Sequence, residues 1–154
     1  METRLAAKLR LLNDFVRFRK DSINMTPEQK KDAERLQRYI EREQLCSVMN
    51  DTKWREMIEA LKTIVGFHPK FRVKCVRDIE PPTDYWDGSF PHHVPRFKDI
   101  EWLDIDPIVR IHRGQLVADE EKDFTQEVIN ALCSKNIPCS HVGQAIRIWG
   151  YIRP

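Results

Sequence analysis

The stretch DTKWREMIEALKTIVGFHPKFRVKCVRD, residues 51–78, carries the most regular pattern in the chain and decides the fold class. Its first half spaces large apolar residues as on one face of a helix: Trp54, Met57, Ile58, Leu61, Ile64 and Val65. We therefore predict a helix over residues 51–65, with Asn50 or Asp51 as its N-cap. Gly66 favours the left-handed conformation that commonly ends a helix.

A strand follows this helix within the same stretch. Phe71, Val73 and Cys75 alternate with cations, as expected for a strand with one buried face. A second buried helix is predicted at residues 123–135, because its apolar residues recur at helical spacing. Three further strands are predicted at residues 98–105, 108–113 and 145–152.

The strands at 98–105 and 108–113 lie on either side of a turn signal, so they are predicted to pair as a hairpin. Within the first strand, Ile100 and Trp102 are expected to face the core. The acids of this strand are expected to face solvent: Asp99, Glu101 and Asp104.

Residues 119–123 concentrate acids at the start of the second helix, where negative charge favours the positive end of the helix dipole. The last strand, at 145–152, carries bulky residues on both faces, so we expect it in the interior of the sheet or covered on its outer face by another element. Together these elements predict a single α+β domain over residues 49–154. We expect a mixed or antiparallel sheet of about four or five strands, flanked by helices.

Residues 1–48 are predicted to form an N-terminal helical hairpin, either a genuine extension or the product of a misassigned upstream start. Leucines and phenylalanines line one helical face over residues 3–20, and the opposite face is basic. Thr26 and Gln29 match a capping box, which starts a second helix running to about Gln44. Three arginines of the basic face are candidate nucleic-acid contacts: Arg10, Arg17 and Arg19.

The composition is that of a globular protein with its own core: 154 residues, 41% hydrophobic and 32% charged. A chain of this length needs neither metal nor disulfides to stabilise a core. No apolar run approaches the roughly 20 residues of a membrane span, and charges interrupt any signal-peptide core. We therefore expect a cytoplasmic protein whose four cysteines are reduced thiols.

Residues 79–98 interrupt the pattern of helices and strands with four prolines and a glycine. A loop of this length in a compact domain is more often functional than idle. Residues 78–106 contain eight acids and two cations, a net charge of −6. Acids and aromatics are interleaved at Asp84, Tyr85, Trp86 and Asp87. This loop either forms a contact surface for a partner or covers one side of the sheet, with Tyr85 and Trp86 packed inward.

No catalytic or metal-binding motif in the sequence is complete. A zinc site could combine Cys139 and His141 with Cys133 and a distant His92 or His93. Structural zinc sites usually bring their ligands in close pairs, and here only Cys139 and His141 are close. His92 and His93 could supply acid–base chemistry, and Cys75 is interpreted as a small core residue. A carboxylate pair or a Mg²⁺ site would draw on Asp99, Glu101, Asp104 and Asp106. We therefore predict no enzyme, no cofactor and no bound metal.

Four blocks resemble a family of small bacterial proteins that carries a domain-of-unknown-function label. They are MNDTKWREM from Met49, FRVKCVRD from Phe71, FKDIEWLDI from Phe97 and IRIWGY from Ile146. The resemblance covers residues 49–154 and implies no catalytic residue. Many small α+β bacterial proteins of this type resemble immunity proteins, which block toxins. This likeness is an analogy in the type of protein and rests on no shared motif.

We therefore expect a non-enzymatic protein-binding module of the immunity or antitoxin type, which occludes the active site of a toxin. The acidic, aromatic segment favours a partner that is basic at its contact surface. The expected contacts are Asp84, Tyr85, Trp86, Asp87, Asp99, Glu101, Asp104, Glu120 and Glu121. The alternatives are a nucleic-acid-associated regulator that uses the basic residues 4–20, and a small metal-dependent hydrolase. A protein toxin is the expected partner, rather than nucleic acid or a membrane.

Overall fold

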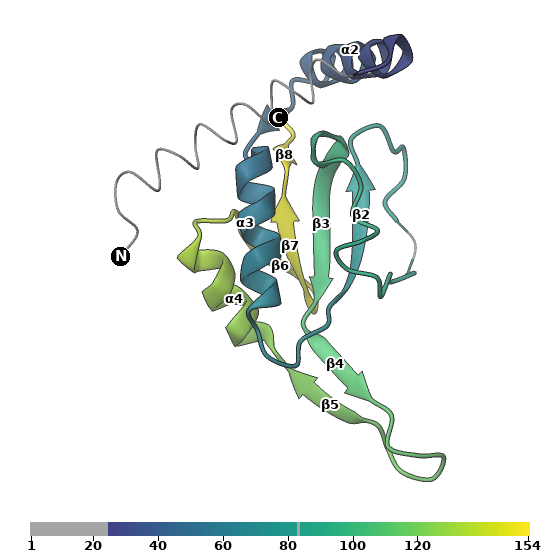
Figure 1. Cartoon of the computed structure of the whole chain (residues 1–154), viewed down its shortest axis with the longest axis vertical. Helices are drawn as coiled ribbons and strands as arrows, with labels where there is room; N and C mark the ends of the chain where they lie inside the picture. Colours follow the sequence, from purple (N-terminus) through teal and green to yellow (C-terminus); the bar gives the residue numbers. More distant parts are fainter. Residues whose placement is uncertain (1–24, 83) are drawn as a thin grey trace. The chain divides into compact units, whose positions relative to one another are not determined.

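The computed structural model describes residues 25–82 and 84–154 (Figure 1). Four predictions lie outside the described residues: the helix over residues 3–20 and the contacts Arg10, Arg17 and Arg19. Among the residues that are described, no helix is long and apolar enough to cross a membrane. All four cysteines are free thiols, as predicted.

The chain divides into two compact units after Tyr39. Helix α2 (Pro27–Arg42) contains most of the described part of the first unit. It begins at the predicted capping box, in which the Thr26 N–H donates to Oε1 of Gln29 (2.9 Å) and the Gln29 N–H donates to Oγ1 of Thr26 (3.2 Å). The boundary predicted between residues 48 and 49 stays a prediction.

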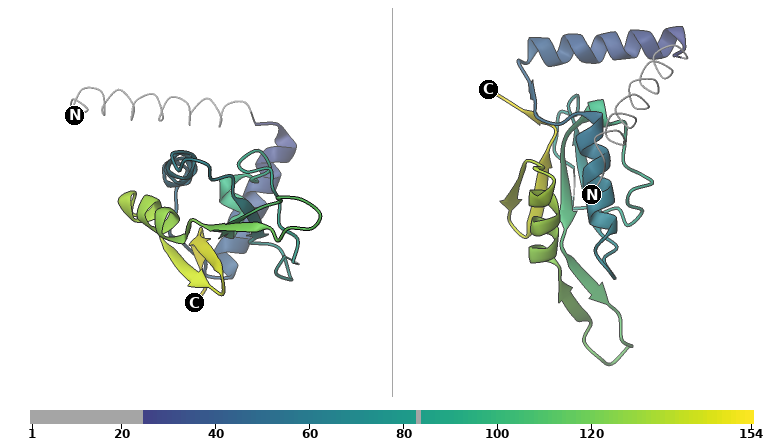
Figure 2. Two further views of the ribbon diagram at one scale, coloured as in Figure 1. Left: turned by 90° about the horizontal axis from the view of Figure 1, so that it is seen from below. Right: turned by 60° about the vertical axis from the view of Figure 1, so that its left-hand side comes forward.

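The second unit is built on a four-stranded antiparallel sheet in the order β2-β3-β7-β6 (Figure 1). Its strands are β2 (Lys70–Cys75), β3 (Ile100–Asp106), β7 (Ala145–Trp149) and β6 (Cys139–Val142). Helices α3 (Asp51–Lys62) and α4 (Thr125–Ser134) lie on one face of this sheet (Figure 2). The predicted α+β class, an antiparallel sheet flanked by helices, is confirmed.

Two short strand pairs and one 3-10 helix complete the second unit. Strand β1 (Cys46–Ser47) pairs with β8 (Tyr151–Ile152), and β4 (Ile108–Ile111) pairs with β5 (Glu120–Asp123). The 3-10 helix η1 (Phe97–Asp99) leads into β3.

The predicted hairpin between residues 98–105 and 108–113 is wrong, because β4 pairs with β5 and not with β3. The predicted helix start at residues 119–123 is wrong for the same reason. Glu120, Glu121 and Asp123 lie on β5, where Glu121 faces Arg110 of β4, and α4 begins only at Thr125. Acids that suit the first turn of a helix also suit a strand that faces cations.

Helix α3 begins where the sequence predicts and ends three residues early. The Asn50 side chain accepts a hydrogen bond from the Lys53 N–H (2.8 Å), which confirms Asn50 as the N-cap. At the other end, the Thr63 hydroxyl donates to the Ala60 carbonyl (2.6 Å) as the helix unwinds. Val65 therefore leaves the apolar stripe and is 90% exposed.

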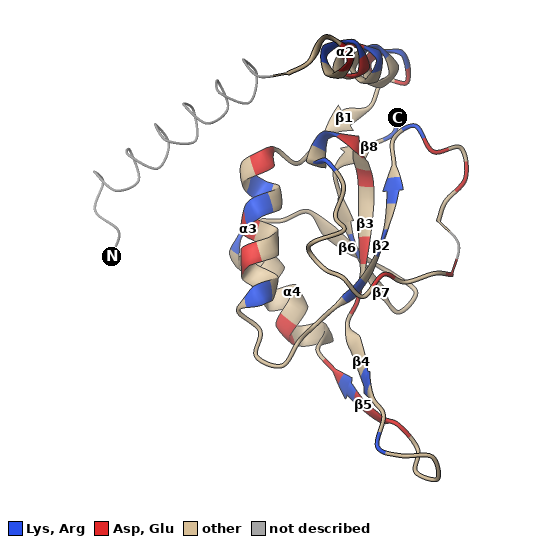
Figure 3. Cartoon of the chain, turned by 45° about the vertical axis from the view of Figure 1, so that its right-hand side comes forward, with Lys and Arg blue, Asp and Glu red and all other residues tan. Residues whose placement is uncertain are grey.

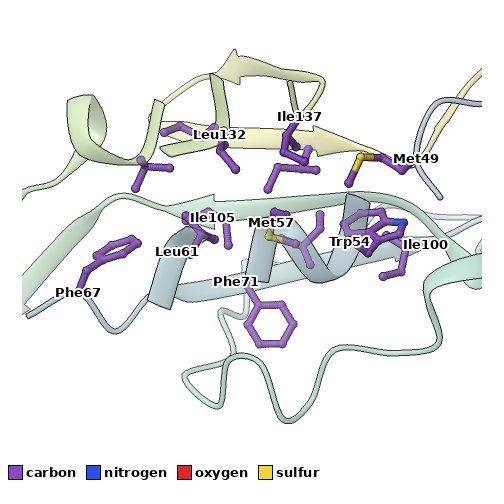
Figure 4. Close-up of a cluster of buried hydrophobic side chains, with 14 of the residues drawn as sticks. Met49, Trp54, Met57, Leu61, Phe67, Phe71, Ile100, Ile105, Leu132 and Ile137 are labelled. Carbon is purple, nitrogen blue, oxygen red and sulfur yellow. The ribbon is translucent and has the colours of Figure 1, made fainter. Parts of the chain in front are cut away.

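The hydrophobic core lies between the two helices and the sheet (Figure 4). Trp54, Met57 and Leu61 of α3 are almost fully buried, as their spacing predicts. The sheet meets them with four fully buried aliphatic side chains: Leu103, Ile105, Ile146 and Ile148. Burial of apolar surface on this side of the sheet stabilises the fold by about 25 cal/mol for each Å² removed from water.

Strand β3 departs from the predicted alternation. Its pairing with β2 skips Glu101, since Lys74 lies opposite Trp102 and Cys75 lies opposite Ile100. A bulge of this kind adds one residue to a strand and shifts the alternation of its side chains. Ile100 consequently joins the core, whereas Trp102 turns to the opposite face, so the prediction that both face the core is wrong.

Strand β7 lies inside the sheet between β3 and β6, as predicted for the last strand. Gly150 follows it and lies against the backbone of β3, where its N–H donates to the Glu101 carbonyl (2.8 Å). A Cβ atom at Gly150 would lie 2.2 Å from the Ile100 carbonyl oxygen and 3.1 Å from Trp54. Only glycine fits this close approach of two backbones.

Candidate functional site

The sheet face opposite α3 and α4 carries charged and aromatic side chains instead of aliphatic ones. Arg72, Asp104 and Arg147 lie in register across three strands, and Lys74, Trp102 and Trp149 form the neighbouring row. We call these six residues the ionic face.

A buried carboxylate holds the first row of the ionic face together. Asp104 is 0% exposed and accepts hydrogen bonds from Nε of Arg72 (3.1 Å), Nε of Arg147 (2.7 Å) and Nη2 of Arg147 (3.0 Å). A buried carboxylate needs such partners, because an isolated charge is very costly to remove from water. Both arginines remain accessible, with side chains 21% and 16% exposed respectively.

Each of the two guanidinium groups packs against a tryptophan ring. The Arg147 guanidinium lies over the Trp102 ring at 3.6 Å and beside Trp149 at 5.5 Å. The Arg72 guanidinium lies over Trp86 at 4.5 Å. Cation–π contacts of this kind favour one orientation of each guanidinium plane.

Glu101 anchors a second ionic cluster beside the first. Its carboxylate accepts hydrogen bonds from Lys74 and from Nε (2.7 Å) and Nη2 (2.9 Å) of Arg153. Burial raises the pKa of Glu101, but the hydrogen bonds from Arg153 and Lys74 outweigh it and hold the pKa below its usual range. The carboxylate therefore stays ionised inside the domain.

The placement of these acids corrects part of the predicted contact surface. Glu101 is 4% exposed and Asp104 is fully buried, so the expectation that they face solvent is wrong. Asp99 is paired with Arg96 (2.8 and 2.9 Å). The net charge of residues 78–106 is thus largely neutralised, because distant cations fold onto it.

The loop over residues 76–96, here called the proline loop, runs beside the edge strand β2. Phe71 and Asp87 exchange two backbone hydrogen bonds (2.9 and 2.8 Å) that attach it to the sheet. Trp86 is half-buried against Arg72, while Asp84 is exposed and Tyr85 is 74% exposed. Trp86 therefore packs inward, as in the prediction of a covering loop, whereas Tyr85 faces outward, as in the prediction of a contact surface.

Asp87 finds a partner in the same loop, which the sequence analysis missed. Its Oδ2 lies 2.8 Å from Nδ1 of His93, and its Oδ1 accepts the Ser89 N–H at 2.7 Å. The Ser89 N–H and His93 together lower the pKa of Asp87. The six-residue spacing of an acid and a histidine within one proline-rich loop was the available signal.

The Asp87–His93 pair borders an open cleft of about 280 Å³ between β2 and the proline loop. Its other walls are largely apolar and aromatic, including Phe71 and Tyr85. An aspartate–histidine pair can move a proton. No serine, threonine, cysteine or lysine is found among the described residues that line the cleft.

Strands β4 and β5 form a two-stranded ribbon that extends beyond the end of the main sheet (Figure 1). We call residues 108–123 the arm. Side-chain contacts join its two sides: the ion pairs of Arg110 with Glu121 (2.9 Å) and of Arg113 with Glu120, and a hydrogen bond between Nδ1 of His112 and Oδ1 of Asp119 (2.9 Å). The predicted contacts Glu120 and Glu121 thus lie on the arm, paired within the chain.

The tip of the arm is uncharged and apolar. Residues 114–118, GQLVA, connect the charged strands, and Figure 3 shows this turn without a charged residue. Leu116 is fully exposed and Val117 is 62% exposed. The sequence contains this signal, because two aliphatic residues stand alone between a glycine and a run of acids.

The remaining chemical candidates do not assemble into a site. Burial raises the pKa of Cys75 to about 11, assisted by the carboxylates of Asp78 and Asp99, so its thiol stays protonated at neutral pH. Cys139 and His141 lie on β6. Within residues 25–82 and 84–154, no group of three or more His, Cys, Asp or Glu side chains is placed to hold a metal ion.

Comparison with known protein families places the second unit and part of α2 within one family model. Residues 36–154 match the model of the family DUF6678, which is described as a family of unknown function. This match confirms the resemblance to a domain of unknown function. No curated protein and no solved structure matches the chain.

Proposed function

We propose that this chain, which belongs to the DUF6678 family of unknown function, is a non-enzymatic protein-binding module of the immunity type. In this proposal it neutralises a toxin by covering the active site of that toxin. The observation that carries the proposal is the distribution of large apolar side chains that the fold leaves exposed.

Five of these side chains lie on the two segments that extend from the domain. Ile79 and Tyr85 belong to the proline loop, and Ile111, Leu116 and Val117 belong to the arm. None of these five side chains belongs to the core cluster or packs against it. Exposed apolar groups on projecting segments favour contact with another protein.

The arm suits insertion into a cleft. A two-stranded ribbon is narrow, and both backbone pairing and side-chain ion pairs join its two sides. Since the tip carries no charge, it can enter an enclosed site without the cost of removing an ion from water. Enzyme active sites are concave and mostly apolar, which matches this shape and chemistry.

The proline loop supplies the complementary charge. Asp78, Glu80 and Asp84 are exposed and alternate with Ile79 and Tyr85. Aromatic and aliphatic anchors surrounded by charge are typical of binding hot spots. These acids support a partner that is basic at its contact surface, since complementary potentials speed and orient encounter.

The experiment is a growth assay with the protein encoded next to this chain. The C-terminal domain of that neighbour is expressed in cells with and without the full chain, and growth is recorded. We expect growth arrest by the neighbour, rescue by the wild type, and loss of rescue with Leu116→Asp combined with Tyr85→Ala. Purified proteins should show the same loss in their dissociation constant.

Val65→Asp is the matched control, because Val65 is equally exposed but lies on neither projecting segment. It should rescue growth as the wild type does. The proposal fails if no neighbouring product arrests growth, or if the double variant rescues as well as the control.

A further inference from the structure

We propose that the ionic face binds single-stranded nucleic acid, with a phosphate held between Arg72 and Arg147 and bases stacked on Trp86 and Trp149. The ionic face lies apart from the arm, whereas Trp86 belongs to the proline loop. Trp149 lies on β7 and on neither projecting segment, so its variants test this proposal independently of the proposed function. Four properties of the described residues carry the nucleic-acid proposal.

The first property is unused hydrogen-bonding capacity. A guanidinium group has five N–H donors. Asp104 takes one from Arg72 and two from Arg147, and the described part of the chain supplies no other acceptor for either group. Guanidinium groups with free N–H donors favour phosphate, whose oxygens they can contact in pairs.

The second property is the spacing of the two arginines. They flank Asp104 in register on neighbouring strands, so their backbones lie two strand spacings apart, about 10 Å. The two side chains reach toward the same carboxylate from opposite sides. An anion above Asp104 can therefore contact both guanidinium groups at once.

The third property is excess positive charge. Two buried carboxylates, Glu101 and Asp104, face four cations on this side of the sheet: Arg72, Lys74, Arg147 and Arg153. Glu43 also pairs with Arg153 (4.0 Å), so the cluster keeps a net charge of +1. Its groups are partly buried, where water screens charge less than at an exposed surface. A bound anion offsets this repulsion.

The fourth property is a pair of tryptophans, one beside each arginine of the first row. Trp86 contacts Arg72 and Trp149 contacts Arg147, and both rings are half-buried. The Trp149 ring is also held by a hydrogen bond from Nε1 to Oγ of Ser140 (3.0 Å). Fixed aromatic rings beside cations provide stacking surfaces for bases next to phosphate contacts.

These four properties favour nucleic acid over an acidic peptide. A peptide carboxylate would use the arginines but has no planar group for the tryptophans. A nucleotide unit uses both, because each unit pairs one phosphate with one aromatic base. The sequence prediction of nucleic-acid binding used only the basic residues 4–20. It did not include the ionic face, because the residues of that face are far apart in the chain.

The test measures fluorescence anisotropy of a labelled single-stranded RNA or DNA of about 10 nucleotides, a length within the usual site size. The full-length chain is titrated at several salt concentrations. The logarithm of the affinity should fall with the logarithm of salt with a slope of about −0.7 for each phosphate contact. Adenosine monophosphate and an acidic peptide of equal charge serve as competitors.

Three variants locate the site. Trp86→Ala and Trp149→Ala should each weaken binding at least about fivefold, and Trp149→Phe should restore most of the loss because it keeps a ring. Arg72→Gln should weaken binding and reduce the salt slope by about 0.7. Arg110→Gln is the matched control, since this arginine is ion-paired on the arm, and it should bind as the wild type does.

A fourth variant separates the ionic face from the N-terminal residues. Combined replacement of Arg10, Arg17 and Arg19 by Gln should leave the effect of the tryptophan variants intact. The proposal is overturned if the strand does not bind at low salt, or if the arginine triple variant alone abolishes binding. It is also overturned if the acidic peptide or the mononucleotide competes as strongly as the unlabelled strand. Circular dichroism of each variant checks that it is folded.

Discussion

The two faces of the four-stranded sheet exclude water by opposite means. On one face Leu103 and Ile148 are fully buried beneath helices α3 and α4. On the other face Asp104 is equally buried and Trp102 is 6% exposed, but arginine and lysine side chains cover them. Flat guanidinium groups are apolar enough above and below their plane to act as this cover.

The difference between the faces separates stability from recognition. The aliphatic face gains its stability from burial of apolar surface. Its described residues contain no charge that salt can screen and no group that titrates near neutral pH. The ionic face gains less net stability, because the cost of removing charges from water offsets most of their attraction. Its cations remain partly accessible and can exchange partners, which the aliphatic residues cannot do.

The largest expected effect falls on the aliphatic face. Leu103→Ala removes a fully buried side chain from the central strand and leaves a cavity, so it should lower the free energy of unfolding by about 3–4 kcal/mol. Urea unfolding followed by circular dichroism measures this loss. The loss should be the same in low and high salt, and a salt-dependent loss would contradict the comparison.

Asp104→Ala tests the ionic face at the adjacent position. It leaves two cations without their carboxylate, and we expect a loss of about 2–3 kcal/mol, less than for a fully enclosed pair because both arginines can reach water. The triple change Asp104→Leu, Arg72→Met and Arg147→Met should recover most of this stability. A triple variant no better than the single one would show that the ionic row stabilises the sheet by itself.

The pH dependence of stability provides a smaller effect. The folded pKa of Glu101 lies below its unfolded value of about 4.3, so its contribution is present above that pH and is lost as the pH falls through the folded pKa. Glu101→Gln should therefore be less stable than the wild type at pH 7, and this difference should shrink in acid. Urea midpoints between neutral pH and about pH 3 measure it, with Glu121→Gln on the arm as the exposed control.

The smallest effect is expected outside both faces. Leu116→Ser with Val117→Ser should change the free energy of unfolding by no more than about 0.5 kcal/mol, because both side chains are already in water. Thermal unfolding compares this variant with the wild type. A large loss would mean that the tip packs on the domain and is not available to a partner.

The sequence predicts the aliphatic face well and the ionic face poorly. The spacing of Trp54, Met57 and Leu61, and the alternation of Ile146 with Ile148, are local patterns that follow from helix and strand geometry. In β3, apolar residues and acids both occur at even-numbered and at odd-numbered positions. The bulge at Glu101 also shifts the alternation of side chains within the strand. A local pattern cannot locate such a bulge.

Charge was the least reliable guide to the candidate site. The acids of residues 78–106 form a net-negative block in the sequence, yet Arg72, Arg147 and Arg153 reach them from outside that block. The run of acids at Glu120 and Glu121 is interpreted as a helix start until their ion-pair partners across the arm, Arg113 and Arg110, are known. Ion pairs between distant residues are decided by the pairing of strands, which composition does not contain.

The positions of the four tryptophans have a spectroscopic consequence. Trp54 alone lies in the aliphatic core, whereas Trp86, Trp102 and Trp149 each lie beside a guanidinium group or a neighbouring ring of the ionic face. The intrinsic emission of this protein therefore reports mainly on the side of the sheet away from its helices. A change in emission without a change in circular dichroism would signal rearrangement of the arginines over their rings, so the native chain can be monitored without a label.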